Sequence, residues 1–209
     1  MAELTFYTNP MSRGQIARWM LEEVGADYDT VILDYGTTLK GAEYLAINPM
    51  GKIPAIVHQG NVVTEGAAIC AYLADVYPAA ALGPATEAER AAYYRWLFYA
   101  AGPIEAAITN RSLGVVPTAD QSRMVGYGSY DTVVDVLDRQ VAASAFVCGD
   151  RFTAADVYFG SQIMWGTQFG SLPARDSFAA YAERLAARDA YKKAKQIDTD
   201  LIAAAQGSA

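Results

Sequence analysis

Residues 48–75 read NPMGKIPAIVHQGNVVTEGAAICAYLAD. Pro54 lies in a short apolar run, Lys52–Val57, and a second run, Val62–Val63, follows the turn signal Gln59-Gly60-Asn61. Two such runs around a turn predict a β-hairpin. After Thr64-Glu65-Gly66, apolar residues recur at helical spacing and predict a helix over 66–76; they are Ala67, Ile69, Tyr72, Leu73 and Val76.

The start of this hairpin and the start of this helix are candidate binding elements. A proline at the first residue of a strand keeps the preceding residue extended and removes a donor from the ladder. Ile53 could therefore offer its backbone N–H and C=O to an extended ligand lying alongside, as an added strand would. The helix that opens at Gly66 presents unpaired N–H groups and partial positive charge, which suit a carboxylate.

The residues before this stretch predict a strand–helix–strand unit. Leu4–Tyr7 alternates like a strand, and apolar residues at i+4 intervals predict a helix over 13–24 that ends at Gly25. A second strand over 28–33 should pair in parallel with the first through a right-handed crossover. A short helix over 41–47 completes a β-α-β-α-β-β-α order.

Everything after the Pro- and Gly-containing link at 77–84 is predicted to be helical. Thr86 is an expected N-cap, and Gly102-Pro103 should kink the first helix. After a loop at 110–118, one long helix should carry four apolar residues on one side: Met124, Val134, Leu137 and Val141. Thr153 and Asp156 form a capping box with a hydrophobic staple from Phe152 to Val157. Two helices near 176–187 and 190–205 finish the chain.

Composition excludes several function classes. The net charge is −7 over 209 residues, which argues against nucleic acid as a partner. No apolar run is long enough to span a bilayer, and the first residues do not resemble a signal peptide. Two distant cysteines, Cys70 and Cys148, suit a reducing cytosol and are expected to be buried small hydrophobes. His58, the single histidine, has too few potential partners for a metal site.

The order I-P, hairpin, E-G-A-A-I-x-x-Y-L resembles the glutathione-binding half of the cytosolic glutathione transferases, bacterial in type, and the resemblance covers essentially the whole chain. It implies a thioredoxin-like domain at 1–78, a linker at 79–85, and an all-α domain at 86–209 with a second-substrate pocket. It further implies a cytoplasmic homodimer that acts in detoxification. The aromatic run at 93–99 is expected to serve the core, the dimer interface or that pocket.

The resemblance also assigns roles to residues of the central stretch. It implies that Pro54 is cis, that the Ile53 backbone pairs with the cysteinyl unit of glutathione, and that Glu65 and Gly66 hold the γ-glutamyl end. The family usually has serine where this chain has Gly66, so a hydroxyl contact is lost and weaker glutathione binding is expected. Lys40 and Lys52 are candidates for the glycyl carboxylate, and Glu105 for a contact across a dimer.

The junction after the first strand should carry the group that stabilises the glutathione thiolate. Family members use a tyrosine at the end of this strand or a serine or cysteine at the helix start. Ser12 is the first candidate, Asn9 the second, and Tyr7 and Thr8 follow; Ser12 could equally be a helix N-cap. No cysteine lies here, which disfavours direct thiol–disulfide exchange by the protein.

The predicted function is transfer of glutathione, the co-substrate, to small apolar electrophiles. Two alternatives stay open: a glutathione-dependent reductase of disulfides or peroxides, in which Asn9 steers the thiolate, and a non-catalytic scaffold that binds ligands or partners.

Overall fold

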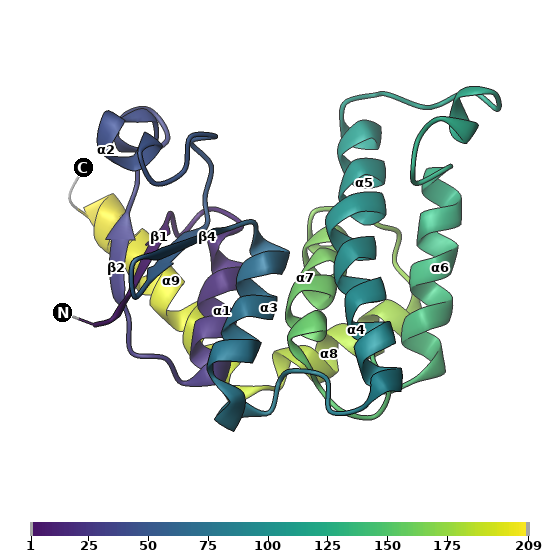
Figure 1. Cartoon of the computed structure of the whole chain (residues 1–209). Helices are drawn as coiled ribbons and strands as arrows, with labels where there is room; N and C mark the ends of the chain where they lie inside the picture. Colours follow the sequence, from purple (N-terminus) through teal and green to yellow (C-terminus); the bar gives the residue numbers. More distant parts are fainter. Residues whose placement is uncertain (1, 208–209) are drawn as a thin grey trace. The chain divides into compact units, whose positions relative to one another are not determined.

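The computed structural model describes residues 2–207 of the chain, which form two compact units (Figure 1). The first unit comprises the described residues of Met1–Ala80 and Arg188–Ala209, and the second unit comprises Ala81–Ala187. The first unit contains a mixed sheet with helices and the second is helical, so the predicted fold class is confirmed.

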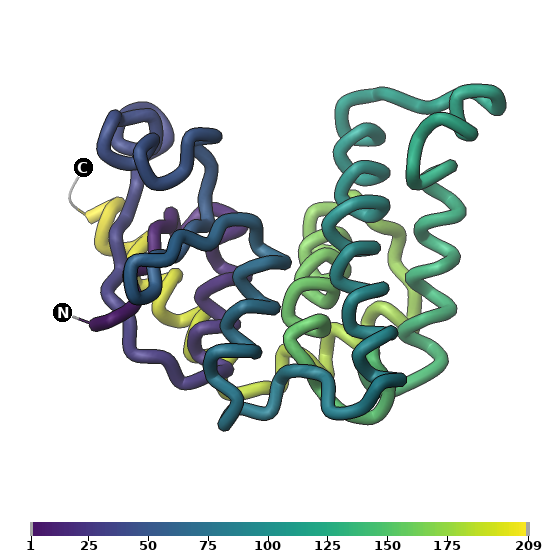
Figure 2. Tube along the Cα trace, viewed as in Figure 1, coloured from purple at the N-terminus to yellow at the C-terminus, as the bar shows by residue number. Residues whose placement is uncertain are grey.

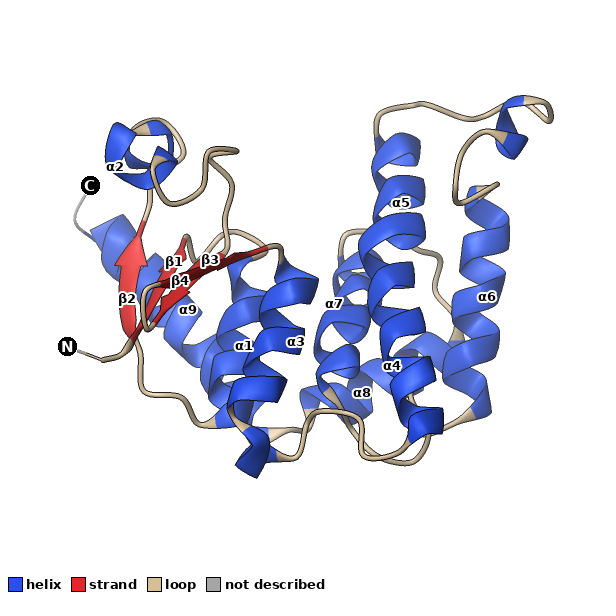
Figure 3. Cartoon of the chain, viewed as in Figure 1, coloured by secondary structure: helices blue, strands red, loops and turns tan. Residues whose placement is uncertain are grey.

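The sheet of the first unit has the strand order β2-β1-β3-β4 (Figure 3). The first two strands pair in parallel and the other pairs are antiparallel, as the predicted crossover and hairpin require. The strands are β1 (Leu4–Thr8), β2 (Asp29–Ile32), β3 (Ala55–His58) and β4 (Asn61–Thr64).

Three helices of this unit lie close to their predicted positions, namely α1 (Gly14–Val24), α2 (Ala42–Leu45) and α3 (Gly66–Val76). The predicted helix end at Gly25 is a left-handed C-cap with φ 64°, a conformation that glycine adopts without a Cβ penalty. Alternation along β1 separates the two faces of the sheet. Phe6 is buried beside Arg18 of α1, whereas Tyr7 packs against Tyr44 of α2.

The last helix, α9 (Asp189–Gly207), belongs to the first unit and lies alongside α1 (Figure 2). The predicted all-α domain at 86–209 included this helix, so the observed division differs from that range. The physical reason is a buried ion pair, 2.8 Å from Arg18 Nε to Asp198 Oδ1, together with an edge-on contact of Trp19 and Tyr191. A charge as deeply buried as that of Arg18 needs such a partner.

The helical unit begins as predicted. Thr86 caps α4 (Glu87–Tyr99) by accepting a hydrogen bond of 3.1 Å from the Glu89 N–H. The expected irregularity at Gly102-Pro103 is a π-helical turn, Ala100–Ile104, which leads into α5 (Glu105–Ser112). The remaining helices are α6 (Tyr130–Ala143), α7 (Ala154–Gln168) and α8 (Asp176–Ala186).

The predicted capping box opens α7, whose residues Ala154–Ile163 are all buried. Asp156 accepts from the Thr153 N–H at 2.9 Å, as a capping box requires. Its other oxygen accepts from the Val147 N–H and from the Tyr181 hydroxyl, both at 2.7 Å. Burial raises the pKa of this carboxyl even though all these donors oppose the shift. Through these bonds Asp156 also holds the segment at Val147 and the side chain of Tyr181 against α7.

The prediction for residue 124 was wrong. Met124 is 85% exposed and lies outside α6, which begins only after the N-cap Ser129. The Ser129 hydroxyl accepts from the Thr132 N–H at 3.1 Å. Gly128, with φ 68°, lies immediately before this cap and stops the helix from extending backwards. The other three residues predicted for this side, Val134, Leu137 and Val141, are buried in α6.

Candidate functional site

The strand register brings three predicted segments to one end of the sheet. Tyr7 lies opposite Ala55, and Ala55 lies opposite Thr64. The loop after β1, the Ile53-Pro54 bond before β3 and Glu65 after β4 therefore share this end. Neighbouring strands are about 4.8 Å apart, so β1 and β4 are separated by roughly 10 Å. Three extended residues span about the same length.

Ile53 has the free backbone groups that a ligand strand would need. Within residues 2–207, neither its N–H nor its C=O has a hydrogen-bond partner. The Ile53-Pro54 peptide bond is cis, as the resemblance implies. The carbonyl of the preceding residue, Lys52, accepts from the Tyr44 hydroxyl at 2.5 Å and from Asn48 Nδ2 at 2.8 Å. The segment ahead of β3 is thus fixed through the Lys52 carbonyl, and the backbone N–H and C=O of Ile53 stay free for a ligand.

Glu65 occupies the N-cap position of α3 in a strained conformation. Its φ is 66° and its ψ is 120°, which is unusual for a residue with a side chain and costs about 1–3 kcal/mol. The side chain is exposed and does not cap the helix. The first N–H groups of α3, beginning at Gly66, thus lie beside a carboxylate that is not used for capping. A γ-glutamyl group carries both an ammonium and a carboxylate and would match this arrangement.

The loop after β1 contains the first two predicted catalytic residues, and both are buried. The Ser12 hydroxyl donates to the Asn9 carbonyl at 2.6 Å and accepts from the Gly14 N–H at 2.9 Å. The amide of Asn9 is used at both ends: Nδ2 donates to the Leu33 carbonyl and Oδ1 accepts from the Met11 N–H, each at 2.9 Å. Asn9 therefore fixes the loop, whereas Ser12 is an N-terminal hydroxyl of α1.

The other two candidates lie elsewhere. Thr8 is fully buried and lies against Gly14. The contact is so close that a methyl group built on that glycine would overlap the threonine Oγ1. Tyr7 is on the opposite face of the sheet, where it lines a cavity of about 660 Å³ beside α2. Tyr44 lines the same cavity, and burial raises its pKa to about 12. Tyr7 is thus part of the packing against α2.

The two predicted lysines differ in their contacts. Lys40 donates to the Met50 carbonyl at 3.2 Å and to the Gly51 carbonyl at 2.8 Å, so it holds the loop ahead of the cis bond. Lys52 is exposed, and its ammonium has no partner within residues 2–207. The ammonium of Lys52 is thus free for a ligand carboxylate, whereas the ammonium of Lys40 already donates to two backbone carbonyls.

Four supporting residues carried no functional signal in the sequence. Gly14 allows α1 to approach β1, and a methyl group there would also lie 2.9 Å from Ser12 Oγ. Tyr44 and Asn48 hold the Lys52 carbonyl. Gln15 donates from Nε2 to the Pro10 carbonyl at 2.5 Å. Only Asn48, which precedes a proline, carried a local turn signal.

The thiols and the histidine are engaged in packing. Cys70 is fully buried, and burial raises the pKa of its thiol. Cys148 is only half-buried, contrary to the expectation, and this partial burial raises the pKa of its thiol to about 11, so neither cysteine is a ready nucleophile. His58 Nδ1 lies 2.9 Å from the Tyr72 hydroxyl. No group of three metal-ligating side chains occurs in the described part of the chain.

The helical unit presents aromatic side chains and a charged depression. Tyr93 and Trp96 of α4 are buried, whereas Tyr94 and Phe98 are 47% and 73% exposed.

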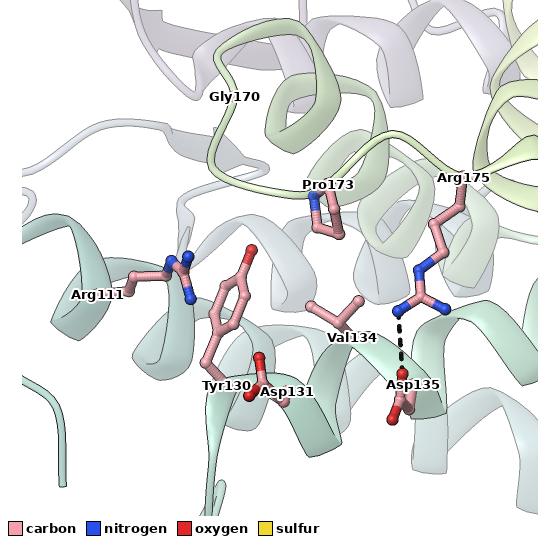
Figure 4. Close-up of a pocket in the computed structure, with 8 residues that line it drawn as sticks. All are labelled: Arg111, Tyr130, Asp131, Val134, Asp135, Gly170, Pro173 and Arg175. Carbon is pink, nitrogen blue, oxygen red and sulfur yellow. Dashed lines mark hydrogen bonds and ion pairs between the residues drawn. The ribbon is translucent and has the colours of Figure 1, made fainter.

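A depression of about 450 Å³ lies at the start of α6 (Figure 4). In it the Arg111 guanidinium lies 4.0 Å from the centre of the Tyr130 ring, and Arg175 pairs with Asp135 at 3.0 Å. This charged lining does not match an apolar ligand.

Glu105, the expected cross-dimer residue, contacts the Tyr158 hydroxyl at 3.5 Å. None of the helices over residues 2–207 combines the length and apolar character that crossing a membrane needs.

The first unit has a thioredoxin-like sheet with a cis-proline before β3 and two helix N-termini at the same end, and a helical unit follows it. Together these features are those of the glutathione-binding transferase class. The family model for the N-terminal domain of glutathione S-transferases matches residues 2–75. Glutathione S-transferase 3 of Zea mays is 32% identical over 209 residues, covering 92% of this chain and 93% of that protein. The chain belongs to the glutathione S-transferase family, whose co-substrate is glutathione.

Two further relatives bear on the activity. The theta class glutathione S-transferase of Xanthomonas axonopodis pv. citri, solved with glutathione bound, is 27% identical with a TM-score of 0.74, covering 93% of this chain and 97% of that one. The disulfide-bond oxidoreductase YghU of Escherichia coli is 28% identical over 181 residues, covering 78% of this chain and 62% of that protein.

Proposed function

We propose that this transferase conjugates glutathione to small apolar electrophiles, and that it works in the cytoplasm as a homodimer. The observation that carries the proposal is the unpaired backbone of Ile53, which lies at the same end of the sheet as the starts of α1 and α3. An unpaired backbone N–H and C=O beside two helix N-termini suit a short extended peptide with acidic ends.

Three elements would hold the tripeptide. The N–H and C=O of Ile53 would pair with the cysteinyl unit. The Glu65 carboxylate would accept from the γ-glutamyl ammonium, and the Gly66 N–H would donate to the γ-glutamyl carboxylate. Lys52 would pair with the glycyl carboxylate, since its ammonium is exposed. Each charged contact of this kind contributes roughly 1.5–3 kcal/mol when well aligned.

Ser12 would activate the thiol. A free cysteine-type thiol has a pKa of roughly 8.5, so most of it is protonated at neutral pH. Each unit by which the site lowers this pKa corresponds to about 1.4 kcal/mol of thiolate stabilisation. The Ser12 proton, which the Asn9 carbonyl accepts here, would turn to the sulfur, and the N-terminus of α1 would add its partial positive charge. The protein positions and stabilises the nucleophile.

The electrophile and the partner subunit would use the aromatic surfaces of the helical unit. We assign the exposed pair Tyr94 and Phe98, one turn apart on α4, to the contact between two copies. The charged depression at Arg111 and Asp135 is not assigned to the electrophile.

Reduction of disulfides or peroxides is the second candidate, because one relative is a disulfide-bond oxidoreductase. Neither cysteine lies in the loop after β1, and the thiol pKa of each is raised. A reductase built on this chain would therefore draw both thiols from glutathione, with the Asn9 amide beside the first.

The test is direct binding of glutathione by calorimetry, followed by turnover of an aromatic electrophile, a peroxide and a small disulfide. Saturable binding with conjugation of the electrophile supports the transferase. Turnover of only the peroxide or disulfide would favour the reductase, and absence of binding would leave a scaffold. Glu65→Gln should weaken binding roughly 10-fold or more by removing a charged contact, and the exposed Glu43→Gln is its control.

A further inference from the structure

A side chain of α1 holds the apex of the loop that carries Ser12. Gln15 Nε2 donates to the Pro10 carbonyl at 2.5 Å. Proline has no backbone N–H, so this carbonyl is its single main-chain polar group. The other fixing contacts come from Asn9 and Ser12, which belong to the loop itself. Gln15 therefore ties the loop to the body of the helix that follows it.

A residue 180 positions away fixes the orientation of the Gln15 amide. Lys195 Nζ of α9 lies 2.9 Å from Gln15 Oε1. An ammonium only donates and a carbonyl only accepts, so the amide satisfies both neighbours in one orientation alone. A flipped amide would set its NH₂ against the ammonium and its oxygen against the Pro10 carbonyl. The charge on Lys195 also polarises the amide and strengthens the bond from Nε2.

Lys195 is itself held in place, because α9 is anchored to α1 on both sides of it. Arg188 pairs with Glu23 at 2.6 Å, and Asp198 pairs with Arg18 at 2.8 Å. Both Gln15 and Lys195 are half-buried, so solvent screens their contact less than it would at an open surface. The lysine is thus presented to Gln15 by a fixed helix.

We propose that Lys195 and Gln15 are positioning residues that set the place of Ser12 through the Pro10 carbonyl. The inference rests on the proposed role of Ser12, and it makes α9 a part of the site although α9 lies outside residues 2–75. The device acts on the geometry of the loop and leaves the peptide contacts of Ile53 and Glu65 untouched. Its loss should therefore lower kcat and not glutathione affinity.

Three variants separate positioning from simple helix attachment. Gln15→Glu keeps a strong partner for Lys195 but cannot donate to Pro10, because an ionised carboxylate only accepts. Lys195→Met removes the orienting charge. Lys193→Met is the control, since it breaks another α9–α1 ion pair, 2.6 Å from Lys193 Nζ to Glu22 Oε2, that does not contact the loop.

The first readout is hydrogen–deuterium exchange of the backbone amides of Asn9, Met11 and Ser12 in the ligand-free protein, which needs no activity. Exchange should rise in Gln15→Glu and Lys195→Met and stay unchanged in Lys193→Met, with similar thermal midpoints for Gln15→Glu and the wild type. The second readout is turnover. Both positioning variants should lose roughly fivefold in kcat, with glutathione Kd within about twofold, and the ultraviolet absorbance of bound thiolate should titrate at higher pH.

The outcomes distinguish this inference from the proposed function. Unchanged loop exchange in Gln15→Glu would overturn the positioning role even if the wild type is an active transferase. Raised exchange with wild-type kcat would overturn its link to catalysis. A wild type that fails to bind glutathione would instead overturn the proposed function, and the exchange data would still decide whether Gln15 and Lys195 hold the loop.

Discussion

One oxygen at Ser12 serves two purposes. It accepts from the Gly14 N–H at the start of α1, and its proton goes to the Asn9 carbonyl. Ser12→Ala should therefore lower turnover by roughly 10-fold or more, the size of a hydrogen bond to a charged sulfur, with little change in glutathione affinity. Stability should fall by about 1 kcal/mol because the local cap is lost.

Thr86→Ala is the matched control for this substitution, since it removes an N-cap hydroxyl from α4 without touching the proposed site. Steady-state kinetics and thermal unfolding of both variants make the comparison. Wild-type turnover in Ser12→Ala would exclude Ser12 as the residue that activates the thiol.

Gly66 offers a gain of binding. The backbone N–H at the start of α3 remains, but this chain lacks the hydroxyl that the family usually places there. Gly66→Ser should tighten glutathione binding roughly 2- to 10-fold, the range of one net hydrogen bond. Calorimetry measures the change, and Ala68→Ser on the exposed side of the same turn should leave affinity unaltered. Equal effects of the two serines would contradict the assignment of Gly66.

At the scale of elements, Arg151 fastens the start of α4 to the segment before α7. Its guanidinium donates to both carboxylate oxygens of Glu89, at 3.2 and 2.6 Å, and also to the Ala81 and Gly83 carbonyls. The Arg151 side chain first, and then the Ala85 N–H, hold the pKa of Glu89 below its usual value of 4.5. An ionised Glu89 therefore stabilises the folded helical unit.

The sign of the pH dependence follows from this shift. Because the folded pKa lies below the unfolded one, the contribution is complete above pH 4.5 and is lost as the pH falls through the lowered pKa. The thermal midpoint of Glu89→Gln should lie below that of the wild type at neutral pH, and the gap should close in acid. A difference in thermal midpoint that stays constant down to acid pH would exclude the Glu89 carboxylate as its source. Glu87→Gln is the control: Glu87 belongs to an exposed ion pair, so its thermal midpoint should lie close to that of the wild type.

At the scale of the whole molecule, the exposed pair Tyr94 and Phe98 on α4 is the proposed contact between the two copies of a homodimer. Phe98→Lys should convert a dimer into a monomer in sedimentation experiments, because a charge in the centre of an apolar interface is left unpaired. Phe169→Lys is an exact match in exposure, since both side chains are 73% exposed. A dimer that survives Phe98→Lys, or that is lost equally in Phe169→Lys, would remove α4 from the proposed interface.

The parts of the fold that were predictable are those with a local signal. The hairpin that follows Pro54, the Gly25 helix end and the Thr153–Asp156 box each depend on residues a few positions apart, whereas the cis form of the Ile53-Pro54 bond was implied by the family resemblance. Met124 was misplaced because its apolar side chain fits a helical spacing that Gly128 and the Ser129 cap interrupt.

The parts that were missed depend on distant residues. The hydrogen bonds from Lys40 to the carbonyls of Met50 and Gly51 join parts of the chain ten and eleven residues apart and gave no local signal, and the role of Lys40 toward a ligand stays a prediction. The assignment of α9 to the first unit rests on pairs such as Arg18–Asp198, which are 180 positions apart and leave no pattern in either segment. The roles of the site residues themselves stay predictions, which the variants above address.

The placement of α9 affects how the chain can fold during synthesis. Residues 81–187 are contiguous, so the helical unit can fold as soon as it has left the ribosome. The first unit cannot be completed until α9 has been translated, and until then Arg18 and Trp19 lack the residues that bury them. The nascent chain therefore leaves the side of α1 that faces α9 uncovered while residues 81–187 are synthesised.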